Sequence, residues 1–231
     1  MTVHPHTFVG VGLYSAAEAG ALVQVSPSKI TRWLRGHHIG LREYQPLWRA
    51  QVDLGDDGLF LGFRDLMEVR VAAAFIRAGL SPQKVRSAIK IARGVIHDDH
   101  PLSTTWLRTD GRSVFLQIAE QDGTAKLIDL FKDQYAFRDI VERSLSNIDF
   151  DTGGLPARWW PLGKSKAIVI DPAKSFGRPI ETKSSVPAEV LAAAAIAEGS
   201  VQAAARAWSV PLSAVSRAVA FQREMENRKA A

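Results

Sequence analysis

Helix-capping residues near the N-terminus constrain the fold of this chain more than any other feature of its sequence. Ser15 is followed three residues later by Glu18, the capping-box pattern that starts a helix. Ser26 precedes Pro27, and proline is favoured in the first turn because the amide it lacks would have no helical partner there. Gly36 follows as a helix stop. The spacing predicts two short helices joined by a tight turn, a helix-turn-helix.

The second of these helices is expected to have an apolar face and a basic face. Apolar residues recur at helical spacing and would face a core. The opposite side and the segment just beyond it offer Ser28, Lys29, Arg32, Arg35 and Arg42. Arginine and lysine bind guanine edges and phosphates, and serine binds either. The sequence predicts a DNA-reading helix, and the alternative is an amphipathic helix with a solvated basic face.

Turn-forming residues downstream predict a hairpin, or wing. A Gly-Asp-Asp-Gly run at 55–58 separates the apolar segments 47–48 and 59–61. Two further helices are expected over 63–78 and 82–96, and the second is preceded by a serine-proline cap.

The order of these elements resembles the MerR-like winged-helix family over about residues 12–96. The resemblance implies a DNA-binding domain that docks in the major groove. No long dimerising coiled coil follows, which differs from full-length MerR regulators.

The middle of the chain suggests a second hairpin. Segments 105–107 and 113–118 alternate around Asp110-Gly111, a favoured two-residue hairpin turn. Apolar residues within 125–137 then predict a helix.

A tryptophan pair follows in a segment rich in glycine and proline. Trp159 and Trp160 stand between two prolines, which predicts a linker with an exposed aromatic pair. Because such a pair is costly to leave in water, we expect it to fold back onto the predicted hairpin or to contact a partner. The candidate partner-binding residues are Arg158, Trp159, Trp160 and Arg178.

The C-terminal segment 200–221 repeats the first motif at a constant offset of 185 residues. Ser200 matches Ser15, and Arg217 matches Arg32. Two other basic positions of the first copy are alanines in the second. We therefore expect a second helix-turn-helix that binds DNA less strongly, if at all.

The segment before this repeat carries a further signature. A short strand at 167–170 leads into Asp171-Pro172 and then into a Gly-Arg-Pro-Ile step that ends at Ile180. With the helices that follow, it resembles the family catalogued as domain of unknown function 433, whose members are predicted antitoxins, over about residues 167–224. Members commonly continue with Gly-Thr-Arg, whereas Glu181 and its neighbours stand here.

The whole combination resembles VapB-type antitoxins, which are paired with a PIN-like ribonuclease toxin. The resemblance implies a protein that neutralises this toxin and represses the shared promoter. Its implied partners are double-stranded DNA, the toxin and a second copy of the chain in a homodimer. The alternative is a stand-alone MerR-like regulator whose C-terminal half senses a small molecule or dimerises.

These features predict a mainly α protein with small β-hairpins, of the α+β class. A winged helix-turn-helix and a C-terminal helical bundle with a second helix-turn-helix are expected. The expected divisions are a DNA-binding domain over 1–100, a connecting or dimerising hairpin and helix over 101–152, a linker over 153–166 and an antitoxin-like helical module over 167–231.

Charge and composition limit the binding partners, the covalent chemistry and the cellular location that we expect for this chain. Lys and Arg exceed Asp and Glu by 29 to 24, and residues 64–96 and 155–231 each carry +5 while 97–154 carries −5. Basic surfaces favour phosphates and an acidic one favours a basic partner, although ordinary solvated surface is the alternative. The absence of cysteine from all 231 residues excludes disulfides and a cysteine nucleophile. With no signal-peptide pattern and no apolar run near the roughly 18 residues that span a bilayer, we expect a cytoplasmic protein.

No residue pattern indicates an enzyme. His97 and His100 flank Asp98 and Asp99, but adjacent residues rarely converge on one ion, and Pro101 favours a loop. No serine lies in a nucleophile elbow. We expect no catalytic residue, no metal ligand and no cofactor.

Overall fold

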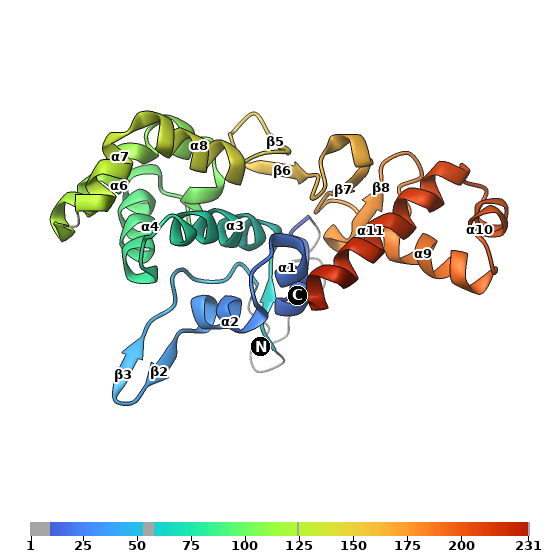
Figure 1. Ribbon diagram of the computed structural model, residues 1–231, viewed down its shortest axis with the longest axis horizontal. Helices are drawn as coiled ribbons and strands as arrows, with labels where there is room; N and C mark the ends of the chain where they lie inside the picture. Colours follow the sequence, from blue (N-terminus) through green and yellow to red (C-terminus); the bar gives the residue numbers. More distant parts are fainter. Residues whose placement is uncertain (1–9, 53–57, 124, 231) are drawn as a thin grey trace.

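The computed structural model describes residues 10–52, 58–123 and 125–230. Within these residues the protein is mainly helical and has three small antiparallel sheets, which confirms the expected α+β class. The molecule is elongated: helices α6 and α7 lie at one end, α10 lies at the other, and the N-terminal elements occupy the middle (Figure 1).

The N-terminal elements pack around helix α3, most of whose residues are buried. Their bounds are β1 Tyr14–Ser15, α1 Ala16–Val23, α2 Pro27–Arg35, β2 His37–Ile39, β3 Arg42–Tyr44, β4 Phe60–Leu61, α3 Phe63–Arg77 and α4 Pro82–Ile96. The Ser15 capping box is present, because the Ser15 hydroxyl accepts from the Glu18 amide and the Glu18 carboxylate accepts from the Ser15 amide. The two helices expected after the turn are confirmed as α3 and α4, and Ser81 caps α4.

The middle of the chain is helical, so the hairpin predicted around Asp110-Gly111 is wrong. Its elements are η2 Pro101–Ser103, α5 Trp106–Thr109, α6 Gly111–Asp122, α7 Ala125–Lys132 and α8 Gln134–Ser144. The buried residues of α6 recur at helical rather than alternating spacing. Phe115 stacks on Phe75 of α3 with ring centroids 4.1 Å apart, and Phe131 and Phe137 complete the cluster. A helix is therefore what buries this aromatic set.

A four-stranded antiparallel sheet follows in the order β5-β6-β7-β8. Its strands are β5 Ile148–Phe150, β6 Pro156–Trp159, β7 Ile168–Ile170 and β8 Pro179–Glu181, with short turns η3 Lys164–Lys166 and η4 Ser175–Gly177 between them. The segment predicted as a linker therefore contains a strand. Trp159 and Trp160 are both buried, so the expectation of an exposed pair is wrong, and they pack on this sheet and α3 rather than on a hairpin.

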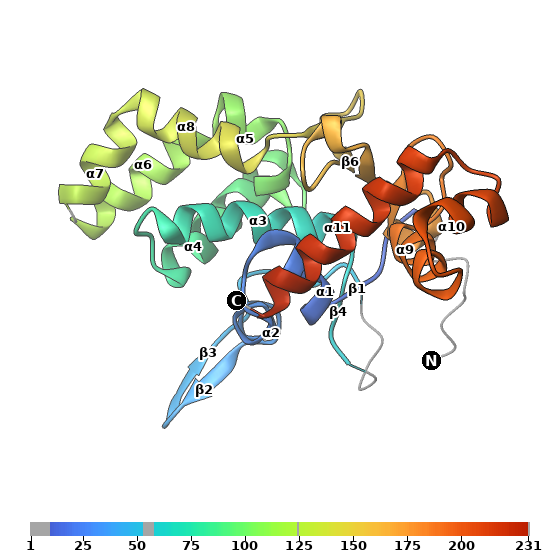
Figure 2. The same ribbon diagram turned by 45° about the vertical axis from the view of Figure 1, so that its right-hand side comes forward.

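Three helices complete the chain: α9 Ala188–Ala197, α10 Val201–Ala207 and α11 Leu212–Ala230. Ser200 caps α10 through the Ala203 amide, as the repeat predicts. The N-terminal part of α11 packs on α9, and its C-terminal part reaches α1 of the N-terminal elements (Figure 2).

A second contact ties the C-terminal module to the N-terminal elements. The Tyr14 hydroxyl donates to the Gly177 carbonyl at 2.9 Å, and the Leu13 amide donates to the Phe176 carbonyl at 3.0 Å. Gly177 has a φ of +78°, and a Cβ there would lie 2.3 Å from the Tyr14 hydroxyl oxygen. Glycine is therefore required where the two parts meet.

Candidate nucleic-acid interface

Helix α2 begins and ends where the sequence predicts, but one capping contact differs. Pro27 occupies the first turn and Gly36, with a φ of +72°, follows the last residue. The Ser26 side chain makes no capping bond to the backbone and instead lies 3.4 Å from the Ser28 hydroxyl. Proline rather than a serine cap therefore sets the start of this helix.

The two faces of α2 are separated as expected. Ile30, Trp33 and Leu34 are buried in the main core. The exposed residues of the helix include Ser28, Lys29, Arg32 and Arg35, and Arg42 is exposed on β3. None of these four cations has an ion-pair partner within the described parts of the chain. Their donors are free to bind an anionic ligand.

The turn between α1 and α2 depends on a close backbone approach. Gln24 ends α1 in the left-handed conformation, with a φ of 56°. The Val25 amide donates back to the Gly20 carbonyl at 3.2 Å. A Cβ on Gly20 would lie 2.6 Å from the Val25 carbonyl oxygen, so only glycine allows this turn. The turn fixes the angle at which α2 leaves α1.

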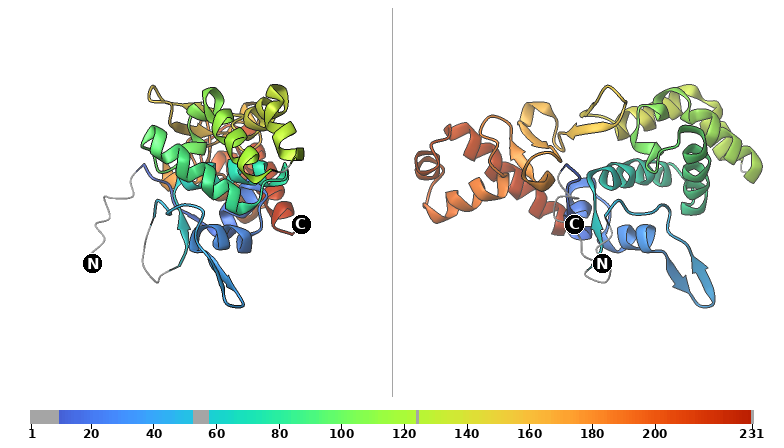
Figure 3. Two further views of the ribbon diagram at one scale, coloured as in Figure 1. Left: turned by 90° about the vertical axis from the view of Figure 1, so that its left-hand side faces the viewer. Right: turned by 180° about the vertical axis from the view of Figure 1, so that it is seen from behind.

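The hairpin beside α2 lies at a different place from the predicted wing. Strands β2 and β3 pair antiparallel around a turn at Gly40 and Leu41, and the hairpin projects from the body of the protein (Figure 3). Residues 53–57, which hold most of the predicted turn, lie outside the described residues, and Phe60–Leu61 pair with β1 instead of with 47–48. The prediction of a wing at 47–61 is wrong, because β1 supplies the partner for β4.

A groove of about 450 Å³ runs between α2, the hairpin and the start of α4. Lys29 and Arg32 line one side, and Arg77 of α3 and Arg86 of α4 line the other. Arg86 donates to the carbonyls of Gln45 and Pro46, and burial lowers the pKa of its guanidinium. Sequence reasoning missed Arg77 and Arg86, because only packing brings α3 and α4 beside α2.

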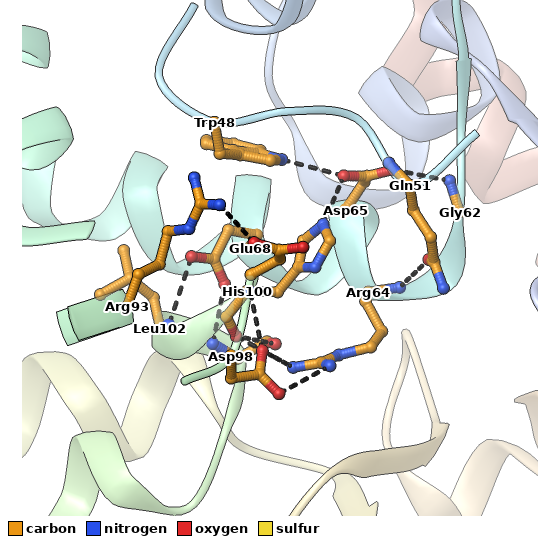
Figure 4. A network of polar contacts seen from close by, with 12 residues as sticks. Trp48, Gln51, Gly62, Arg64, Asp65, Glu68, Arg93, Asp98, His100 and Leu102 are labelled. Atoms are coloured by element: carbon orange, nitrogen blue, oxygen red, sulfur yellow. Dashed lines mark hydrogen bonds and ion pairs between the residues drawn. The ribbon is translucent and has the colours of Figure 1, made fainter. Parts of the chain in front are cut away.

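A buried polar network holds the segment after the hairpin against α3 (Figure 4). The Asp65 carboxylate is fully buried and accepts from the Trp48 indole at 2.9 Å and the Gln51 amide at 2.8 Å. It also accepts from the Gly62 amide at 3.0 Å and lies 2.8 Å from Nε2 of His100. Because these bonds join residues 48–51, Gly62 and His100 to one carboxylate of α3, the segment that follows the hairpin is held rigidly.

Glu68 is the second buried carboxylate of this network. It accepts from the Leu102 amide at 3.2 Å and the Ser103 amide at 2.9 Å. Burial raises the pKa of Glu68 to about 7, and the nearby His100, the two amides and Arg64 only partly offset it. No sequence signal predicts the Glu68 contacts, since Leu102 and Ser103 lie 34 and 35 residues from Glu68.

The run His97 to His100 is a structural loop in which Asp98 and His100 already have partners. Two guanidinium nitrogens of Arg64 donate hydrogen bonds to the Asp98 carboxylate, at 2.9 and 2.6 Å. Burial alone would raise the pKa of Asp98, but the hydrogen bonds from Arg64 and from the His100 amide outweigh it and lower the pKa. Within the described residues, no three His, Cys, Asp or Glu side chains are placed to hold a metal ion.

The predicted partner-binding residues do not form one surface. Arg158 pairs with Asp149 at 3.1 Å and lies over the Trp160 ring, whereas Trp159 lies under Arg70 of α3. Arg178 pairs with Glu189 near the start of α9. Of the four, only the two arginines are exposed.

The helix pair α10–α11, where the sequence predicts a second helix-turn-helix, presents a different surface from α2. Arg217, which corresponds to Arg32, donates to the fully buried Glu181 of β8. Ser184 also donates to Glu181 through its amide and hydroxyl, at 2.8 and 2.9 Å. Burial alone would raise the pKa of Glu181, but these bonds and Arg217 outweigh it and lower the pKa. Arg217 is therefore committed to an internal ion pair.

Two known proteins are similar to this chain. It is 28% identical over 185 residues to a protein named putative antitoxin VapB45 from Mycobacterium tuberculosis, covering 74% of this chain and 77% of that protein. The crystal structure of Rv2018 from Mycobacterium tuberculosis has a TM-score of 0.69 and 26% identity, covering 89% of this chain and 96% of that one. No family model matches. The chain is therefore similar to a VapB-type antitoxin, and none of its described helices is long and apolar enough to span a membrane.

Proposed function

We propose that this protein is a DNA-binding antitoxin of the cytoplasm, which neutralises a PIN-like ribonuclease toxin and represses their shared promoter. The observation that carries the DNA-binding half is the exposed face of α2, whose cations have no ion-pair partner within the described residues. The antitoxin half is supported by similarity to the putative antitoxin over three-quarters of both chains. We propose a binding role and no catalytic one.

Helix α2 is proposed to lie in the major groove. Arg32 and Lys29 stand at the centre of its exposed face, with Ser28 toward one end and Arg35 toward the other. Long cationic side chains of this kind bind guanine edges or phosphates. Arg42 on the projecting hairpin then reaches the flanking backbone.

The groove beside α2 supports this docking. Arg77 is exposed on the wall opposite Arg32, so that cations line both sides of the space where a phosphate strand would run. Sequence-independent phosphate contacts position a protein on DNA. The buried Asp65 network holds the segment that follows the hairpin against α3, so this segment needs little further ordering when DNA binds.

The toxin-binding half is assigned by similarity and by the surfaces that DNA would not use. Arg158 and Arg178 remain exposed on the sheet and at the start of the C-terminal module, each beside a carboxylate. Strand β6, which contains Arg158, and strand β8, which Arg178 precedes, lie away from α2 (Figure 1).

The antitoxin role is tested by growth of cells that express the small open reading frame adjacent to this gene. We expect arrest that co-expression of this protein relieves. The matched control is the same toxin with the variant Arg32→Ala, which should still relieve arrest because α2 is assigned to DNA. A neighbour that is harmless, or toxic regardless of this protein, would leave the stand-alone regulator as the better account.

The DNA-binding role is tested by fluorescence anisotropy with a duplex of the gene's own promoter and a shuffled duplex of equal length. We expect tighter binding to the promoter and an affinity that falls steeply as salt rises, because phosphate contacts release counterions. Equal affinity for both duplexes would contradict sequence-specific repression.

A further inference from the structure

The C-terminal module exposes apolar side chains at the turn between α10 and α11. We define the turn patch as Trp208, Val210 and Leu212. Trp208 is 44% exposed and Leu212 is 49% exposed, while Val210 is half-buried. Ile196, at the end of α9 in the same module, is also exposed. Clustered apolar exposure of this kind marks an interaction surface.

In the first helix-turn-helix, the residues that correspond to Trp208 and Val210 of the turn patch are buried. Trp208 and Val210 correspond to Val23 and Val25 in the first copy, which are only 7% and 8% exposed. There, α3 and the C-terminal part of α11 pack against α1. Within the described residues no element packs in the same way over the second turn. The same motif is thus covered in one place and uncovered in the other.

The charge of the surrounding module indicates what kind of surface covers it. Only four of the 36 residues from 186 to 221 are charged, whereas 23% of the whole chain is charged. The four are Glu189, Glu198, Arg206 and Arg217, so the segment is neutral in a chain of net charge +5. Depletion of charge around an aromatic anchor is typical of protein–protein interfaces.

We propose that the turn patch is a dimer interface that binds the same patch of a second copy of this chain. This rests on the proposed function, because a two-fold dimer would place two copies of α2 on one promoter site. A two-fold axis brings identical surfaces together, so a surface with a net charge would be repelled by its own copy. The neutral segment 186–221 avoids this repulsion, whereas the basic face of α2 would repel its own copy.

Two exposed charges favour this arrangement further. Glu198 follows α9 and Arg206 lies two residues before Trp208. Neither has an ion-pair partner within the described residues. One copy therefore offers an unpaired anion and an unpaired cation to the other, while Trp208 and Leu212 fill the centre.

The test is the mass of the purified full-length protein by size exclusion with light scattering, without DNA or toxin. We expect about twice the 25.3 kDa of one chain. Trp208→Asp and Leu212→Asp should raise the dimer dissociation constant by about 30-fold or more, as expected for a central anchor. Tyr135→Asp, at an exposed aromatic residue of α8, is the matched control and should leave the dimer intact. Circular dichroism confirms that each variant is folded.

Several outcomes would overturn the proposal. If the wild-type protein is monomeric at every protein concentration at which its mass is measured, a second copy is excluded as the occupant of the turn patch. A Trp208→Asp variant that remains dimeric assigns the dimer to another surface. A monomeric wild type that binds the toxin only when Trp208 is intact assigns the patch to the toxin. Because the mass measurement needs neither DNA nor toxin, its failure is distinct from failure of the proposed function.

Discussion

Two helix pairs of this protein, α1–α2 and α10–α11, share a capping pattern and differ in the role of the corresponding arginine. Ser15 and Ser200 cap the first helix of each unit through a backbone amide three residues later. Arg32 in the first unit is exposed, with no ion-pair partner within the described residues. Arg217 in the second unit is bound to the buried Glu181. Capping residues therefore specify the motif, while an acidic neighbour decides whether its arginine is available to a ligand.

A second difference between the two regions concerns their buried glutamates. Glu68 in α3 and Glu181 in β8 are both fully buried. Glu68 has no cation bonded to it among the described residues, and burial raises its pKa to about 7. Glu181 has Arg217, and its pKa is lowered despite burial. One region therefore favours a protonated carboxyl and the other requires an ionised one.

The largest effect that sharpens this comparison comes from Arg217→Ala. Removing one partner of a buried ion pair leaves the charge of the other partner uncompensated. We expect a loss of about 2–4 kcal/mol in the free energy of unfolding. This is less than the cost of breaking a fully buried pair, because the Arg217 side chain is partly exposed. Arg32→Ala is the matched control and should change it by less than about 0.5 kcal/mol. Urea denaturation measures both. Equal effects would remove the distinction between the two arginines.

The pH dependence of stability separates the two glutamates. Since the pKa of Glu68 is about 7 when folded and 4.5 ordinarily, its contribution is fully present below 4.5 and is lost as pH rises to about 7. Glu181, whose pKa is lowered, stabilises above its ordinary pKa and loses that contribution as pH falls. We expect the unfolding free energy of Glu68→Gln, relative to wild type, to rise by about 3 kcal/mol between pH 4.5 and 7.5. A difference that stays constant with pH would contradict a protonated Glu68.

The DNA affinity of Arg32→Ala tests the other half of the comparison. We expect it to lose about 1–3 kcal/mol of promoter binding if Arg32 contacts a base, with less discrimination between promoter and shuffled duplex. Arg223→Ala, at an exposed cation of α11, is the control for loss of charge alone and should bind nearly as wild type. Anisotropy at fixed salt measures both. Unchanged affinity for Arg32→Ala would exclude Arg32 from base recognition.

Local signals in the sequence were sufficient for the elements of both units. The cap at Ser15, the proline at the start of α2 and the glycine after it predict α1 and α2 to within a residue. The offset of 185 residues also predicts α10 and the start of α11, but α11 continues to Ala230, beyond the matched segment that ends at 221. These features depend on hydrogen bonds between residues three or four apart, which sequence spacing records.

Features that depend on distant partners could not be predicted. Asp110-Gly111 suits either a hairpin turn or the start of a helix, and packing of Phe115 on Phe75 decides in favour of α6. The Asp65–His100 contact, the Glu68 contacts and the Glu181 ion pair join residues 34 to 36 apart, and their spacing carries no periodic signal. For the candidate site, the sequence therefore predicts helix α2 and its exposed basic face, and the structure adds the groove beside α2 and the buried network behind it.

The smallest expected effect on the free energy of unfolding comes from removing the two serine caps, Ser15 and Ser200. Ser15→Ala removes a hydroxyl that accepts from the Glu18 amide and donates to the Glu18 carboxylate at 2.7 Å, whereas Ser200→Ala removes only one bond to the Ala203 amide. We expect losses of unfolding free energy of about 1–2 and about 0.5–1 kcal/mol, respectively. Urea denaturation beside Ser213→Ala, an exposed serine of α11, gives the baseline. If the two substitutions lower the free energy of unfolding equally, the reciprocal Glu18 contact adds nothing to the stability of the first cap.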